Sequence, residues 1–124
     1  MRALFDNVEE LIESLRMEEC LIIVEGRKDV EKLEEFGIHS VKLKGNLKSF
    51  CENVEARKVV LLMDTDREGK VLTHKLKTYF ARLGVKTNLF YWNNLKKLRV
   101  THVEGLKLKL PKHYAPYFSK SKSF

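Results

Sequence analysis

The stretch that decides the fold is an apolar run followed at once by a charged turn, Val59-Val60-Leu61-Leu62-Met63-Asp64-Thr65-Asp66-Arg67-Glu68-Gly69. Its five apolar residues, 59–63, begin with two β-branched side chains and contain no polar interruption. Such a run is typical of a strand covered on both faces in a parallel sheet. Beyond Lys70, apolar residues recur at helical spacing from Val71 to Leu83, and Gly84 follows, which predicts a long helix.

A second apolar run has the same design. Residues 20–24 read Cys-Leu-Ile-Ile-Val, and Glu25 and Gly26 come directly after them. If the two strands are neighbours in the sheet, Glu25, Asp64 and Asp66 converge at one edge, beyond the carboxyl ends of the strands, where ligands of such sheets bind. The glycine after each group of acids is expected to let the backbone approach a bulky ligand.

Shorter elements fill the rest of the chain as far as residue 92, and beyond it the periodicity weakens. Each is indicated by apolar spacing and by a capping or stop residue at its end. In chain order we expect a helix at 4–15 started by Asp6 and Glu9, a helix at 29–36 capped by Asp29, a strand at 41–43, a helix at 47–54 and a strand at 85–91.

Strands that alternate with helices over short loops define the fold class. We expect an α/β fold, a single compact domain with a mostly parallel four-stranded sheet between helices. The expected divisions are an N-terminal helix at 1–17, an α/β domain at 18–92, and a basic C-terminal extension at 93–124. The extension either packs on the domain or trails from it.

Composition narrows the class of protein further. Of the 124 residues, 44% are apolar and 33% are charged, which is enough to form a core. No apolar run approaches the roughly 18 residues that span a bilayer. The N-terminus turns acidic within ten residues, unlike a signal peptide, and Cys20 and Cys51 are expected to be reduced and buried. We therefore expect a cytoplasmic protein with no membrane partner.

The net charge of +7 lies entirely at the C-terminal end. Residues 1–94 carry sixteen basic and sixteen acidic side chains, whereas residues 95–124 carry eight basic and one acidic. A neutral body with a basic tail suits a polyanion, because cations displace counterions from phosphates; a solubilising tail is the alternative. Aromatic residues of this tail, His102 among them, either stack on unpaired bases or pin the tail to the domain.

Carboxylates gathered at one edge are costly unless some protonate or a cation neutralises them. Mg²⁺ suits such a group because it is a hard ion that keeps several waters and bridges to phosphate oxygens, and Mn²⁺ is an alternative. A single acid after a strand is usually a helix cap or a solvated residue, so the prediction depends on both motifs together. Glu68 either joins the metal or forms a salt bridge. Arg27, Arg67 and Lys70 either balance the acids or hold a phosphate.

Residues 21–29, taken together with residues 61–69, resemble the TOPRIM domain. That family covers the metal-binding domain of topoisomerases and bacterial-type primases, OLD-type nucleases, RecR-like repair proteins and a ribonuclease that matures small ribosomal RNA. The resemblance extends over about residues 18–92. The chain has no room for a topoisomerase's tyrosine-bearing domain or a primase's zinc domain, so it looks most like the small stand-alone TOPRIM proteins of archaea.

The family pattern places a glutamate after the first strand and Asp-x-Asp after the third, which Glu25, Asp64 and Asp66 match. The Asp-Thr-Asp-Arg-Glu-Gly sequence is especially similar to the type IA topoisomerase version, whose third acid falls on Glu68. The resemblance implies a domain that binds Mg²⁺ and acts on nucleic-acid phosphodiesters. It implies catalytic roles for Glu25, Asp64 and Asp66, and metal binding by these three with Glu68.

The function we expect is Mg²⁺-dependent hydrolysis of RNA or DNA, with structured-RNA processing as the nearest analogue. One alternative is a non-catalytic nucleic-acid- or protein-binding module that acts in a homodimer or a larger complex. Another is a phosphoacceptor domain, which fits less well because no lysine ends a further strand. The residues expected to contact nucleic acid are all basic, and they are Arg27, Lys28, Arg67, Lys70, Lys96, Lys97, Arg99, Lys107, Lys109 and Lys112.

Overall fold

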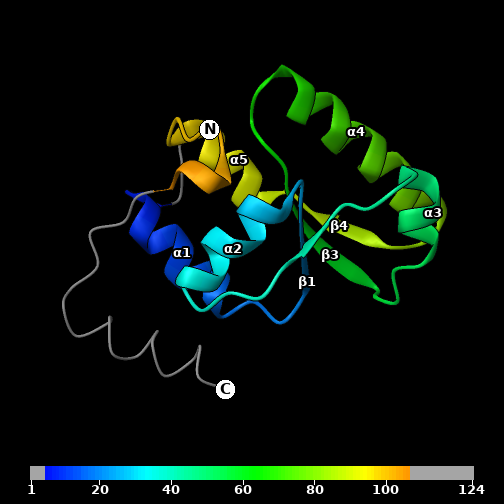
Figure 1. The fold of residues 1–124 in the computed structure, drawn as a ribbon, viewed down its shortest axis with the longest axis horizontal. Helices are drawn as coiled ribbons and strands as arrows, with labels where there is room; N and C mark the ends of the chain where they lie inside the picture. Colours follow the sequence, from blue (N-terminus) through cyan, green and yellow to red (C-terminus); the bar gives the residue numbers. More distant parts are fainter. Residues whose placement is uncertain (1–4, 107–124) are drawn as a thin grey trace.

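The computed structural model describes residues 5–106, which form a four-stranded sheet with helices on both faces (Figure 1). Its strands run in the order β2-β1-β3-β4, and every neighbouring pair is parallel, which confirms the predicted fold class. The strands are β1 Leu21–Val24, β2 Val41–Lys42, β3 Lys58–Leu62 and β4 Lys86–Asn88. The helices are α1 Val8–Arg16, α2 Arg27–Glu35, α3 Leu47–Glu52, α4 Arg67–Arg82, α5 Phe90–Lys97 and the 3₁₀ turn η1 Val103–Gly105.

The register of the two central strands decides where the functional residues lie. Leu21 pairs with Val59 and Val24 pairs with Leu62, so β1 and β3 end level with each other. Both strands consist almost entirely of buried aliphatic residues, as expected for strands covered on both faces. The loops that follow them therefore leave the sheet at the same edge.

Alternate residues of these strands supply two separate apolar cores. On one face, Ile22 and Val60 pack with α1, α2 and α5. On the other face, Ile23 and Leu61 pack with α3 and α4, where Phe80 is fully buried. This alternation is the period-two pattern of a strand, so one short sequence serves two layers. Figure 1 shows the two helical layers on either side of the strands.

Two local expectations are wrong. Residues 85–91 form a strand only over Lys86–Asn88, because Asn88 Oδ1 accepts a hydrogen bond from Phe90 N at 2.8 Å and the chain turns into α5. Helix α1 is capped by Asn7, whose side chain accepts from Glu10 N, rather than by Asp6.

The described residues beyond α5, 98–106, pack into the same unit. Leu95 of α5 is 1% exposed, Val103 is 1% exposed and Leu106 is 4% exposed, and all three join the core that α1 lines. The boundary expected between residues 92 and 93 lies inside α5. Among residues 5–106, the structure contains no helix with the length and apolar character needed to cross a bilayer.

Candidate metal centre at the carboxyl edge of the sheet

The acidic residue that follows β1 contacts the loop that follows β3. Glu25 Oε1 accepts a hydrogen bond from the backbone N–H of Asp64 at 3.0 Å, and both residues are partly buried. The contact follows from the level ends of β1 and β3, since each chain leaves its strand at the same height. Two carboxylates that are 39 residues apart in sequence thus share one edge of the sheet.

The second aspartate of the Asp-Thr-Asp sequence begins helix α4. Asp66 is the N-cap residue, and its Oδ1 accepts from Gly69 N at 2.8 Å. The carbonyl of Asp64 accepts from Trp92 Nε1 at 3.2 Å, which ties the same loop to α5. The loop is therefore held at both of its acidic residues, which is what a preorganised site requires.

Gly69 is required here for a reason that differs from the expectation. A Cβ atom added at Gly69 would lie 1.8 Å from the carbonyl oxygen of Asp64, so the first turn of α4 packs directly on the loop backbone. The glycine thus permits an approach within the chain rather than an approach to a ligand. At Gly26 there is room, because a Cβ atom there would meet nothing nearer than Asp29 Oδ2 at 3.9 Å.

Asp29 supports the site without facing it. Its carboxylate is buried, with 6% of the residue exposed, and it accepts from Gly26 N at 3.0 Å and from Glu104 N at 3.1 Å. The first bond completes the N-terminal cap of α2, in line with the capping role expected for this residue, and the second holds η1 against α2. Burial raises the pKa of Asp29, and the negative charge of Asp64 adds to the effect.

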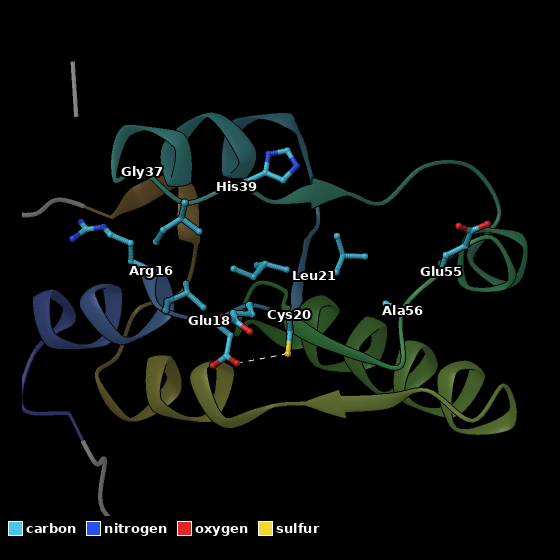
Figure 2. Close-up of a pocket in the computed structure, with 12 residues that line it drawn as sticks. Arg16, Glu18, Cys20, Leu21, Gly37, His39, Glu55 and Ala56 are labelled. Carbon is cyan, nitrogen blue, oxygen red and sulfur yellow. Dashed lines mark hydrogen bonds between the residues drawn. The ribbon is translucent and has the colours of Figure 1, made fainter. Parts of the chain in front are cut away.

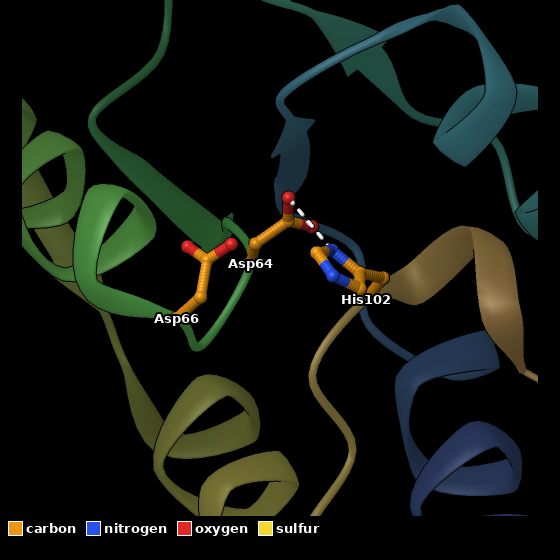
Figure 3. Close-up of side chains that lie close together, drawn as sticks. All are labelled: Asp64, Asp66 and His102. Atoms are coloured by element: carbon orange, nitrogen blue, oxygen red, sulfur yellow. Dashed lines mark ion pairs between the residues drawn. The ribbon is translucent and has the colours of Figure 1, made fainter.

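A histidine completes the group. His102 Nδ1 lies 3.0 Å from Asp64 Oδ2, and Asp64, Asp66 and His102 each offer a ligand atom within 4.8 Å of the others (Figure 3). Two carboxylates and an imidazole are a donor set that divalent cations accept, so the residues present fit a metal ion. Glu25, the fourth member of this edge, is outside this group: its carboxylate accepts from the backbone N–H of Asp64 rather than meeting the Asp64 carboxylate.

The electrostatics reflect this crowding. Burial raises the pKa of Glu25, and the negative charges of Asp64 and Asp66 raise it further, while the hydrogen bond from Asp64 N acts in the opposite direction. The pKa of His102 is also raised, first by its hydrogen bond with Asp64 and then by the surrounding carboxylates. Neighbouring carboxylates contribute to both shifts, and a bound cation would oppose that contribution.

Glu68 shares a depression with Glu25. This depression, of about 380 Å³, is also lined by Arg67 and Lys75, and Glu68 is not part of the group formed by Asp64, Asp66 and His102. The depression opens beside the acidic edge and carries two cationic side chains.

The basic residues expected to contact nucleic acid fall in three places. Arg27 and Lys28 are exposed in the first turn of α2, and Arg67 and Lys70 are exposed in the first turn of α4. Both helices start at the acidic edge, so these four side chains flank it. Lys96, Lys97 and Arg99 are exposed near the end of α5, and Lys96 Nζ lies 4.1 Å from the centre of the Trp92 ring. The remaining three, Lys107, Lys109 and Lys112, lie outside the described residues.

A second depression, of about 570 Å³, lies at the opposite edge of the sheet, where β1 begins (Figure 2). Figure 2 shows Cys20 there beside Glu18, whose Oε1 accepts from the thiol at 3.6 Å. Burial raises the pKa of Cys20, and Glu18 raises it further, so this thiol is a poor nucleophile. The candidate metal centre lies instead at the carboxyl edge, which is where ligands of parallel sheets bind.

The Toprim domain family matches residues 19–91, and the chain belongs to that family. It is 33% identical over 113 residues to a UPF0292 protein of Methanosarcina barkeri, covering 85% of this chain and 79% of the relative. It is 34% identical over 92 residues to a UPF0292 protein of Methanocaldococcus jannaschii, covering 68% and 72%. A solved structure of a protein from Aquifex aeolicus superposes with a TM-score of 0.76 at 30% identity, covering 82% of this chain and all of that one. The expected family is confirmed.

Sequence reasoning did not place His102 in this group. No local motif indicates it, since His102 lies 36 residues beyond Asp66 in a segment with weak periodicity. Its position depends on how α5 packs, and only the tertiary structure supplies that. The neighbouring threonine of the Asp-Thr-Asp sequence was likewise unassigned, although Thr65 bonds the segment that carries His102.

Proposed function

We propose that this chain is a divalent-metal-dependent nuclease that hydrolyses phosphodiester bonds in structured RNA or at DNA ends. The observation that carries the proposal is the meeting of Glu25 with the Asp64 loop at the carboxyl edge, in a chain of the Toprim family. Toprim domains commonly bind Mg²⁺ in enzymes that act on nucleic acid. Mg²⁺ is the cofactor proposed, and Mn²⁺ is expected to replace it.

The proposed roles follow from the geometry of the acids. Asp64 and Asp66 hold the metal ion, since each offers a carboxylate oxygen to the same small volume. Glu25, whose Oε1 is engaged with Asp64 N, is a further ligand or the base that orients the attacking water. When bound, the ion supplies Lewis-acid polarisation of the scissile phosphate and offsets charge on the leaving oxygen. Glu68 is proposed as an outer ligand reached across the adjacent depression.

The substrate backbone is proposed to lie across the two helix starts. Arg27 and Lys28 on α2, with Arg67 and Lys70 on α4, present exposed cations on either side of the acids. Phosphate contacts of this kind provide affinity and register without selecting a sequence. The excess of basic residues after Asn94 in the sequence is proposed to add to this electrostatic affinity.

The test is a cleavage assay on the full chain with labelled structured RNA and with double-stranded DNA, in Mg²⁺ and in EDTA. Asp64→Asn keeps the shape of the side chain and removes its charge, so cleavage in Mg²⁺ is expected to fall by at least about 100-fold. Asp6→Asn makes the same chemical change at an exposed residue of the N-terminal end and is expected to leave cleavage unchanged. Melting curves of each variant confirm that the fold is retained.

Equal cleavage by wild type in Mg²⁺ and in EDTA, and by Asp64→Asn, contradicts the catalytic assignment. Binding of RNA or DNA without any turnover, in Mg²⁺ or Mn²⁺, selects instead a non-catalytic binding module of the same family. That module would work through a partner chain or a second copy, which size-exclusion chromatography with light scattering would detect.

A further inference from the structure

The segment that carries His102 is fixed on both sides of that residue. Before it, Thr65 Oγ1 donates to Val100 O at 2.7 Å and Thr65 N donates to Thr101 O at 2.9 Å. After it, Val103 is buried in the core, and Glu104 N donates to the buried carboxylate of Asp29. The imidazole is 46% exposed, yet its backbone is held at each neighbouring position. These contacts therefore fix the backbone position of His102 beside the acidic edge.

The spacing of the donors suits one ion. Ligands on opposite sides of a Mg²⁺-sized ion lie about 4.2 Å apart, since each metal–ligand bond is about 2.1 Å. The ligand atoms of Asp64, Asp66 and His102 lie within 4.8 Å of one another, so small side-chain rotations bring all three onto a single ion. Figure 3 shows the imidazole facing Asp64 from the loop before η1, while Asp66 faces the same space from the start of α4.

A simple ion pair between His102 and Asp64 explains less. Exposed pairs of this kind contribute about 0–1 kcal/mol, and a pair alone would need no fixed backbone on both sides. Here the partly buried side chain of Thr65 and the buried side chain of Asp29 both hydrogen-bond the backbone of the segment that bears His102. The arrangement resembles the way proteins hold metal-ligating side chains in place through surrounding hydrogen bonds.

We propose that His102 is a nitrogen ligand of the metal centre and that it shifts the preference of the site from Mg²⁺ toward Mn²⁺ and later transition metals. This inference rests on the metal binding in the proposed function, and it adds the identity of a ligand and the class of ion. The reason is chemical: imidazole is a softer donor than carboxylate, and affinity for nitrogen sites rises from Mn²⁺ along the first transition row, whereas Mg²⁺ prefers oxygen.

The experiment compares the wild type with His102→Gln, with the full chain and with Mn²⁺ and Mg²⁺ as the probes. Free Mn²⁺ is followed by its EPR signal during titration, and Mg²⁺ affinity is obtained by competition. His102→Gln is expected to weaken Mn²⁺ binding by about 10- to 100-fold and to weaken Mg²⁺ binding by less than about threefold. Pulsed EPR of bound Mn²⁺ is expected to show coupling to ¹⁴N in wild type and to lose it in the variant.

The matched control is His74→Ala, which removes an exposed histidine on α4 and is expected to keep both the Mn²⁺ affinity and the nitrogen coupling. Equal Mn²⁺ affinity in wild type and His102→Gln, or nitrogen coupling that persists in His102→Gln, overturns the inference. The two proposals fail separately. If His102→Gln loses the nitrogen coupling but the wild type shows no nuclease activity, His102 remains a metal ligand and the nuclease proposal is wrong. If the wild type cleaves nucleic acid but the coupling is unchanged in His102→Gln, the nuclease proposal stands and the ligand proposal is wrong. A wild type that binds neither ion overturns both.

Discussion

Replacing Gly69 with alanine is the sharpest test of how the acidic loop is positioned. The first turn of α4 lies so close to this loop that an added Cβ would sit 1.8 Å from Asp64 O and 2.5 Å from Asp64 C, whereas ordinary contact begins at 3.4 Å. Both atoms belong to the backbone, so no flexible side chain can move aside. Helix α4 or the loop must shift, and either shift strains the cap bond between Gly69 N and Asp66 Oδ1.

Two opposing effects determine the magnitude. Alanine is favoured over glycine in a helix by up to about 1 kcal/mol. Overpacking a close contact costs about 1–3 kcal/mol, and a backbone overlap of this size belongs at or above the upper end. We expect a net loss of about 2 kcal/mol or more in the free energy of unfolding. At roughly 4 °C per kcal/mol, the melting temperature falls by about 8 °C or more.

The assay is urea unfolding followed by circular dichroism, together with Mn²⁺ titration of the folded variant. Because Asp64 and Asp66 move with the loop, the Mn²⁺ dissociation constant is expected to rise by at least about tenfold. Gly26→Ala is the matched control, since its added Cβ would have room, and it should cost only about 0.5 kcal/mol as an N-cap change. An unfolding free energy for Gly69→Ala equal to or above that of wild type would refute the packing argument.

Two further predictions concern buried groups outside the acidic edge. Asp29→Ala leaves the N–H groups of Gly26 and Glu104 without their acceptor and should lower the free energy of unfolding by about 1–3 kcal/mol. The control is Glu34→Ala, at an exposed residue of the same helix, which should change the free energy of unfolding by less than about 0.5 kcal/mol. Equal urea midpoints for the two variants would contradict this prediction. Burial raises the pKa of Cys51 to about 11, so roughly 0.1% of this thiol is thiolate at pH 8. Iodoacetamide should therefore label Cys51 in urea but not in the native protein. Rapid labelling of Cys51 in the native protein, measured by mass spectrometry, would contradict this prediction.

The parts of the fold that could be predicted are those whose signals are local. The runs at 20–24 and 59–63 are uninterrupted apolar stretches with β-branched residues, so their strands are evident from a few residues each, and most of these residues are buried. The meeting of Glu25 with the Asp64 loop then follows from parallel pairing of these two strands. The fourth strand was only partly predictable, because Val85 to Tyr91 is apolar enough for either structure and Asn88 ends the strand early.

The family match ends at residue 91, yet the structural unit continues to Leu106. Trp92 bonds the carbonyl of Asp64, and Thr65 bonds the segment after α5, so the Asp-Thr-Asp loop takes part of its support from residues beyond the match. These contacts join positions 28 and 35 residues apart, and no periodicity in the sequence encodes them. They are properties of how α5 lies on the sheet.

One backbone position explains why this region was hard to read. Helices α2 and α4 are each followed by a glycine with positive φ, Gly37 and Gly84, and glycine at that position is a visible stop signal. Helix α5 ends with the same hydrogen bonds, Val100 N to Leu95 O and the preceding N–H to Lys96 O, but the residue with φ of 60° is Arg99. Arginine, unlike glycine, is not a residue from which a left-handed conformation can be predicted. The reversal it makes directs the chain back past Thr65 and brings His102 to the acids, so the proposed ligand that sequence could not find depends on a turn that sequence could not show.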